Sequence, residues 1–448
     1  MRKMKRNYLS SKIRLVLGLL LLVGNLTAQN QPLPQIWDLQ ACIDYAIENN
    51  IQVKTAEVSK ESAVEDSKQA RAALFPSVSA SIGQNLGVSP FANSNSAASS
   101  DLSASGSYGI NASWQIFDGG VKSTNIKQAD ISNEIAQLSI EESKNNIKLS
   151  IIQNYLQILY ANEAQKTYEN AVKLSAAQLE SNQIKLEVGA VSKSDVAQWM
   201  SQYASDNYQL TNAQVTLENY KLQLKQLLEL DNLQSINIAL TEPDDKEVMS
   251  LLPDRNTIFE TAINVMPQVK NASLNTEYSE LSIGKAKAGY LPKLSLQASS
   301  ATGNNYTLSS LGFVPQLKNN WNNSLGLSLS IPIYSNRETK TAIAKAQFSV
   351  ESAKLTEQSI RKELYSNIET AYLNALNSQA QYLAAEEKVN SSQTSYDLMD
   401  EQFRLGLKNT IELLTEKNNL ISAQQQLLQA KYTALMNRKV LDYYQGLI

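Results

Sequence analysis

The chain carries the same plan twice, and this repeat limits the folds open to it. Matching positions lie 216 or 217 residues apart in the two halves. Self-similarity at a fixed spacing indicates a duplicated structural unit, so the two halves should fold alike. The matching positions include Pro76 and Pro292, Phe117 and Tyr334, Tyr155 and Tyr372, Gly189 and Gly406, and Asp195 and Glu412.

Each half contains two short segments in which apolar and small polar residues alternate. In the last of them, Leu325, Leu327 and Leu329 alternate with serine and glycine. Strands of about ten residues with one apolar face are typical of outer-membrane β-barrels, and they can cross a bilayer when tilted. The predicted strands cover about 77–86 and 107–117 in the first half, and about 292–300 and 323–333 in the second.

Four such strands cannot form a membrane barrel by themselves. About eight strands are needed to close one, and a sheet in lipid cannot leave its edges open. The chain should therefore oligomerise, and three copies would supply twelve strands. The alternative, a soluble sheet with one buried face, leaves the length of the helices unexplained.

Aromatic residues stand at the ends of these segments. Such residues prefer the interface between membrane and water, where the apolar ring and the polar group are both accommodated. We therefore predict an aromatic girdle of Phe75, Phe117, Tyr290 and Tyr334 on the helix side and Trp321 on the loop side.

Very long helices are predicted after each strand pair. Residues 121–188 and 337–405 contain neither glycine nor proline, and helices of this length are rods of about 100 Å. Glycine-containing turns at 189–193 and 406–409 end the rods, and second helices follow at about 194–230 and 410–444. Their surfaces are rich in Gln, Asn, Ser and Ala, which suits a helical tube that lines water. An ordinary coiled coil is the alternative.

The chain divides into a leader, two repeats and a connector. Residues 1–28 join a basic stretch to a short apolar run and end at Ala28, which is typical of a secretory signal peptide. Each repeat opens with shorter helices, about 39–73 and 258–289, with breaks expected near Asn50 and Pro267. Repeat 1 covers 29–235, the connector 236–255 and repeat 2 256–448.

Composition excludes several classes of function. Without the leader, the chain has 34 basic and 43 acidic residues, and this acidic balance argues against a nucleic-acid partner. Histidine is absent, which removes the commonest metal ligand and the commonest general acid–base. No nucleotide-binding glycine motif is present either. We therefore predict no catalytic site, no cofactor and no metal.

Cys42 is the only cysteine, so no disulfide can form within the chain. The run Leu39-Gln40-Ala41-Cys42 resembles a lipoprotein signal. A polar stretch precedes it, whereas such a signal should directly follow an apolar core. We therefore expect Cys42 to pack on the first helix instead of carrying lipid.

Two short motifs stand at the glycine turns, VGAVSKSDV at 188–196 and LGLKNTIELL at 405–414. With these motifs and its duplicated order of elements, the chain resembles the outer-membrane efflux (TolC-like) family over nearly all of its mature length. The resemblance implies a mixed α + β membrane protein. In that fold a long α-helical barrel is joined to a transmembrane β-barrel, with four strands per protomer and twelve in a homotrimer.

The same resemblance implies a function and partners. It implies a passive export duct in the outer membrane of a Gram-negative bacterium, with a large periplasmic portion. An inner-membrane transporter and a periplasmic adaptor protein would supply energy and cargo, and outer-membrane lipid would surround the barrel. The competing hypothesis is a structural periplasmic coiled-coil or adaptor protein, which does not need repeated pairs of alternating strands.

The resemblance also assigns roles at the two turns. Gly189 and Gly406 correspond to the periplasmic tips, where the adaptor docks in that family. Glu412 matches the first carboxylate of an acidic ring that narrows the entrance, and three such groups around an axis would attract cations. The second ring position is Thr415 here, so a second tier of carboxylates is not expected.

Asp195 matches a tip aspartate that bonds the neighbouring hairpin in that family. The matching partners are Phe403, which has no hydroxyl, and Lys408, which lacks the planar fork of arginine. We expect a weak latch between Asp195 and Lys408, since an exposed ion pair contributes about 1 kcal/mol or less. The alternative is that these charges are solvated helix ends, with Asp195 favouring the dipole of its own helix.

Overall fold

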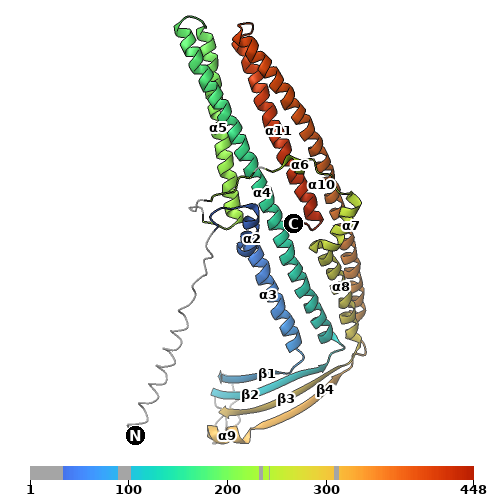
Figure 1. The fold of residues 1–448 in the computed structure, drawn as a ribbon. Helices are drawn as coiled ribbons and strands as arrows, with labels where there is room; N and C mark the ends of the chain where they lie inside the picture. The colour runs from blue at the N-terminus through green and yellow to red at the C-terminus, as the bar shows by residue number, and fades with distance from the viewer. Residues whose placement is uncertain (1–33, 89–101, 232–235, 242, 307–311) are drawn as a thin grey trace, which may run out of the picture.

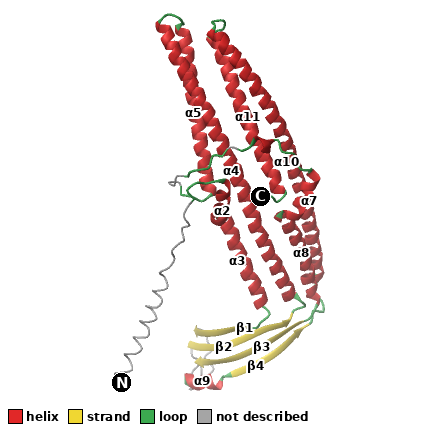
Figure 2. Ribbon diagram, viewed as in Figure 1, coloured by secondary structure: helices red, strands yellow, loops and turns green. Residues whose placement is uncertain are grey.

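The computed structural model describes residues 34–88, 102–231, 236–241, 243–306 and 312–448. The predicted signal peptide at 1–28 and the loop between the first two strands, 89–101, lie outside the described residues. The chain is elongated, with long helices running away from a sheet at one end (Figure 1). Figure 2 shows that the four strands gather at that end, together with the short helix α9 (Phe313–Asn319), while the long helices make up the rest of the molecule.

The four strands form one antiparallel sheet in the order β1-β2-β3-β4. The central pair, β2 and β3, joins the two halves of the chain. The outer edges of β1 and β4 have no strand partner within the described part of the chain. The strands are β1 (Ser77–Val88), β2 (Leu102–Phe117), β3 (Lys293–Tyr306) and β4 (Asn322–Ser330).

Three strand ends differ from the sequence prediction. β2 begins at Leu102 instead of near 107, because residues 102–106 pair with residues 84–88 of β1. β3 likewise extends to Tyr306, opposite Ala104. Small residues dominate both extensions and resemble a loop in sequence, but pairing across the ladder keeps them extended. β4 ends at Ser330 instead of 333, because Pro332 has no N–H to continue the ladder.

The sheet has one apolar face and one small-polar face. The register places Trp114 beside Leu296, and Leu296 beside Leu327. On the other face lie residues such as Ser299 and Ser324, whose hydroxyls are 2.8 Å apart. The apolar face is uncovered in the single chain, and Leu327 is 66% exposed.

Two helical hairpins form the long part of the molecule. The first is α4 (Val121–Glu187) and α5 (Lys193–Leu227), and the second is α10 (Glu338–Arg404) and α11 (Thr410–Tyr444). α4 and α10 have 67 residues each, so each rod is about 100 Å long. Gly189 and Gly406 have a φ of 73°, a left-handed conformation that glycine adopts without a steric penalty. These two residues end the rods and let the chain reverse.

Shorter helices line the half of the rods nearer the sheet. The chain is extended at Asn50 and Met266, and Pro267 is the first residue of the helix that follows. α3 packs on α4, and α8 packs on both α10 and α4. These helices are α2 (Leu39–Asn49), α3 (Ile51–Ala72), α7 (Arg255–Val265) and α8 (Pro267–Lys287); the remaining short elements are α6 (Asp245–Val248), η1 (Ala288–Tyr290) and α9 (Phe313–Asn319).

The main hydrophobic core lies where α2, α4, α5 and α11 meet. Cys42 is fully buried in this core, and burial raises the pKa of its thiol to about 12. The cysteine therefore packs as expected from the sequence, and its position within α2 gives no support to the lipoprotein signal. Among the described helices, none combines the length and the apolar character needed to cross a bilayer.

Candidate functional site

The two glycine turns lie together at the end of the molecule farthest from the sheet (Figure 1). Residues of both hairpins line a cavity of about 900 Å³ between them. Five of the six predicted tip residues line this cavity, and the sixth, Glu412, lies next to it at the start of α11. The cavity brings together positions more than 200 residues apart in the chain. The lining includes Gly189, Ser192, Asp195, Phe403, Gly406, Lys408 and Thr410.

Asp195 and Ser192 form a capping box at the start of α5. The Asp195 N–H donates to the Ser192 hydroxyl at 3.1 Å, and the Ser192 N–H donates back to the carboxylate at 3.1 Å. Reciprocal bonds of this kind satisfy N–H groups that have no partner within the helix. The Ser192 hydroxyl is the main cause of the lowered pKa of Asp195, and the Thr410 hydroxyl adds to it.

Asp195 also joins the two hairpins, but through a different partner from the one expected. The Thr410 hydroxyl donates to Asp195 Oδ1 at 2.7 Å. The expected contact with Lys408 is absent from this chain, because Lys408 pairs instead with Glu412, one helical turn away, at 2.8 Å. The sequence analysis did not select Thr410, because this residue is uncharged and lies two positions after Lys408, which matches the family motif.

Glu412 makes three hydrogen bonds with two residues, Lys408 and Asn409, at the start of α11. It forms a capping box with Asn409, in which each residue's N–H donates to the other's side chain at 3.0–3.1 Å. The hydrogen bond from Lys408 is the main cause of its lowered pKa, followed by that from the Asn409 backbone. Glu412 is thus a fixed carboxylate at the tip, although its charge is partly compensated by Lys408.

Phe403 lines the tip cavity and also packs against a small apolar cluster. The cluster is centred on Trp199, Leu413 and Leu414, and Phe403 packs against it. Trp199 is only 1% exposed. The aromatic ring at position 403 therefore joins the hairpins through apolar contact, where the family motif offers a polar link.

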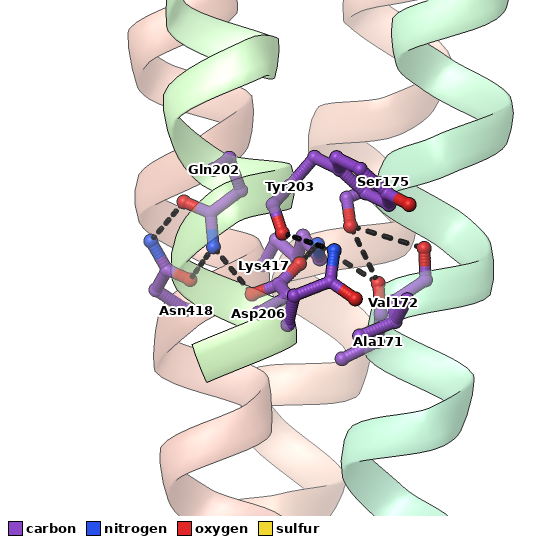
Figure 3. A network of polar contacts seen from close by, with 9 residues as sticks. Ala171, Val172, Ser175, Gln202, Tyr203, Asp206, Lys417 and Asn418 are labelled. Carbon is purple, nitrogen blue, oxygen red and sulfur yellow. Dashed lines mark hydrogen bonds and ion pairs between the residues drawn. The ribbon is translucent and has the colours of Figure 1, made fainter. Parts of the chain in front are cut away.

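A buried ion pair lies one layer deeper, and sequence reasoning missed it entirely. Lys417 of α11 meets Asp206 of α5 at 2.6 Å, and their side chains are 2% and 6% exposed (Figure 3). Burial is the main influence on the pKa of Lys417 and lowers it, against the opposing effect of Asp206. No local pattern signals this contact, since the two residues are 211 positions apart.

The predicted girdle residues all lie on the surface around the sheet. The structure adds Trp114, whose indole N–H donates to the backbone oxygen of Leu74 at 2.7 Å. Its ring belongs to the apolar face and its polar edge reaches the end of α3, which suits an interfacial position. The residues predicted for the girdle, all of them exposed, are Phe75, Phe117, Tyr290, Trp321 and Tyr334.

The comparison with known families decides what the fold is used for. A model described as "Outer membrane efflux protein" matches residues 42–229 and 259–446, once in each half of the chain. The chain belongs to the outer membrane efflux protein family. The two matches together include all four long helices and the strands. Within the part that the structure describes, no group of residues could hold a metal ion.

Individual relatives agree with the family assignment. The outer membrane protein TolC of Salmonella enteritidis is 22% identical over 431 residues, covering 95% of this chain and 85% of that protein. TolC of Vibrio cholerae serotype O1 is 23% identical and covers 90% of this chain and 89% of its own length. The crystal structure of the CmeC outer membrane channel of Campylobacter jejuni has a TM-score of 0.75 at 19% identity, covering 91% and 85% of the two chains.

These findings confirm the predicted combination of long helices with a β-barrel sheet, the function and the location. The protein is an export duct of the Gram-negative outer membrane, with long helices in the periplasm. The hypothesis of a structural coiled coil or free adaptor is set aside, because the family match includes both strand pairs. The family is one of efflux proteins, which is not an enzyme class.

Proposed function

We propose that three copies of this chain form a passive duct through the outer membrane and the periplasm. The observation that carries this proposal is the sheet, which combines an exposed apolar face with two unpaired edges. A sheet in lipid must close on itself, and four strands are too few to do so. Pairing β1 of one protomer with β4 of the next closes twelve strands around a small-polar interior.

The long helices support the same assembly. They expose large apolar side chains on the single chain, among them Phe348, Tyr208 and Leu398 at 60–72% exposure. Exposed apolar area of this extent marks surfaces that become covered by a partner. In a trimer, the helical hairpins of adjacent protomers (α4 with α5, and α10 with α11) would cover these side chains. The hairpins would thereby continue the β-barrel as a helical tube.

The tips form the entrance of the proposed duct. Three copies of Glu412 around the axis would form a ring of carboxylates, each partly neutralised by its own Lys408. The turns at Gly189 and Gly406 would receive a periplasmic adaptor protein, which connects the duct to an inner-membrane transporter. The transporter supplies the energy, and the duct itself contributes no catalytic step.

Single-channel recording in planar bilayers tests the duct and its entrance together. We expect small, cation-selective channels from the parent protein, and a loss of cation preference in Glu412→Ala, because rings of acidic side chains favour cations. Glu416→Ala is the matched control, since it removes a carboxylate from the next turn of the same helix. Unchanged ion selectivity in Glu412→Ala would contradict the role of Glu412 at the entrance, but it would leave the proposed duct intact. Inserted, trimeric protein without channels would contradict the duct.

A further inference from the structure

A buried ion pair joins the two hairpins below the tips. Lys417 Nζ lies 2.6 Å from Asp206 Oδ2 and 3.4 Å from the backbone oxygen of Ala171. The other carboxylate oxygen of Asp206 accepts from Gln202 at 2.7 Å. Three helices therefore meet at one ammonium group: α4, α5 and α11 (Figure 3).

A second pair of side chains continues this layer toward the surface. Gln202 and Asn418 exchange two hydrogen bonds, at 3.0 Å and 3.2 Å. Both bonds again join α5 to α11. The four residues Gln202, Asp206, Lys417 and Asn418 are hereafter called the inter-hairpin latch, and each bond between helices in it connects one hairpin to the other.

The burial of this pair comes from the chain's own helices. Asp206 and Lys417 are covered in the single chain, whereas the tip carboxylate Glu412 remains 38% exposed. A buried ion pair gains little stability over apolar residues of similar size, because both charges lose their water. Such pairs can instead specify one arrangement of the elements that carry them.

The position of the latch suits control of the tips. α11 packs chiefly on α10 and α4 and meets α5 over a short stretch only. Thr410, which bonds Asp195 at the tip, is seven residues from Lys417, or about 10 Å along the helix. Movement of α11 along α5 by one residue, about 1.5 Å, would strain the 2.6 Å ionic contact while both charges stay buried.

We propose that the Asp206–Lys417 pair fixes α11 against α5 and thereby sets the opening of the tips, with the Asp195–Thr410 bond as a secondary contact. This inference rests on the proposed duct and names positioning residues for its entrance. Opening of the tips by separation of the two hairpins requires the pair to break. Apolar side chains at the two positions would fill the same space without holding one alignment of the helices.

The main test compares the parent with the double variant Asp206→Leu/Lys417→Met in planar bilayers. The double variant removes both charges, so it should still fold and assemble. We expect its mean single-channel conductance to rise at least threefold. Thr410→Val should change conductance less than twofold, and Asp130→Asn, which removes an exposed ion pair with Arg71 far from the tips, should leave it unchanged.

A tether across the same layer provides the second readout. In a Cys42→Ala background, Gln202→Cys and Asn418→Cys place two thiols that a short, reducible bis-maleimide can join. The tether should restore the conductance of the double variant to within twofold of the parent, and a reductant should release it again. Spin labels on the same two thiols should give a narrow distance distribution with the ion pair present and a broader one without it.

The outcomes separate this inference from the duct itself. If the parent forms channels and the assembled double variant has the same conductance, the proposed role of the Asp206–Lys417 pair is contradicted. The proposed duct is unaffected by that result. A spin-label distribution that is equally narrow in both proteins would also overturn the latch. Absence of channels from inserted, trimeric parent protein would contradict the duct, while the spin-label comparison would still report on the alignment of α5 and α11.

Discussion

Asp206→Leu alone should destabilise the layer between α5 and α11 far more than removal of both charges. The substitution leaves the Lys417 ammonium buried, with one long contact of 3.4 Å to the oxygen of Ala171. Burial already lowers the pKa of Lys417, and Asp206 is the group that opposes this shift. Without the carboxylate, the pKa should fall further, because only desolvation remains.

Lys417 can lose its proton in Asp206→Leu, and the free energy of this deprotonation is the upper limit of the lost stability. With an ordinary lysine pKa near 10.4, the neutral form costs about 4.6 kcal/mol at pH 7 and about 1.9 kcal/mol at pH 9. The bound at pH 7 agrees with the cost of about 3–5 kcal/mol that follows from breaking a buried pair. The unfolded chain binds this proton more tightly than the folded chain, so the loss of stability is largest well below pH 10.4 and shrinks as the pH rises toward it.

Amide hydrogen exchange in the segments around Asp206 and Lys417 measures the effect, because it reports the free energy of local opening. Relative to the parent at the same pH, exchange should accelerate by up to about 2,500-fold at pH 7 and by up to about 25-fold at pH 9, one factor of ten per pH unit. Asp206→Leu/Lys417→Met should stay within about tenfold of the parent at both pH values. A ratio near one at pH 7, or a ratio that does not fall at pH 9, would refute the reasoning.

Three further predictions concern the tip, the sheet and the core. Ser192→Ala should weaken the start of α5 by about 1 kcal/mol through loss of its cap, seen as faster exchange there, with Ser194→Ala as the unaffected control. Leu327→Arg should cost about 2–4 kcal/mol on a lipid-facing strand and reduce protein in the outer-membrane fraction, whereas Ser328→Arg on the opposite face should be tolerated. Cys42, with a thiol pKa of about 12, should resist maleimide until the protein is denatured; labelling of folded protein at pH 8 would contradict its burial.

Much of the architecture could be predicted because local rules decide it. Glycine at 189 and 406 ends each rod, and both residues adopt the left-handed conformation that other residues avoid. Alternation of apolar and small polar residues marked the strands, since side chains of a strand point to opposite faces in turn. The early start of β2 at Leu102 was missed, because its small residues are held extended by pairing with β1 and not by their own preference.

Some contacts at the tips also follow from the local sequence, and others depend on how the hairpins pack. The sequence by itself determined the charged starts of α5 and α11, because Ser192 and Asp195 are only three residues apart and so meet in any helix that begins there. It did not determine whether Asp195 bonds Lys408 or Thr410, since that choice depends on how two hairpins approach each other.

Only the tertiary structure decided that Asp206 and Lys417 form a buried pair. In sequence each is one charge on a long polar helix, and such charges are usually solvated. Their meeting requires α4, α5 and α11 to pack tightly enough to exclude water around both groups. Local patterns specify which elements form and where they end, whereas the removal of water from a charge depends on neighbours more than 200 residues away.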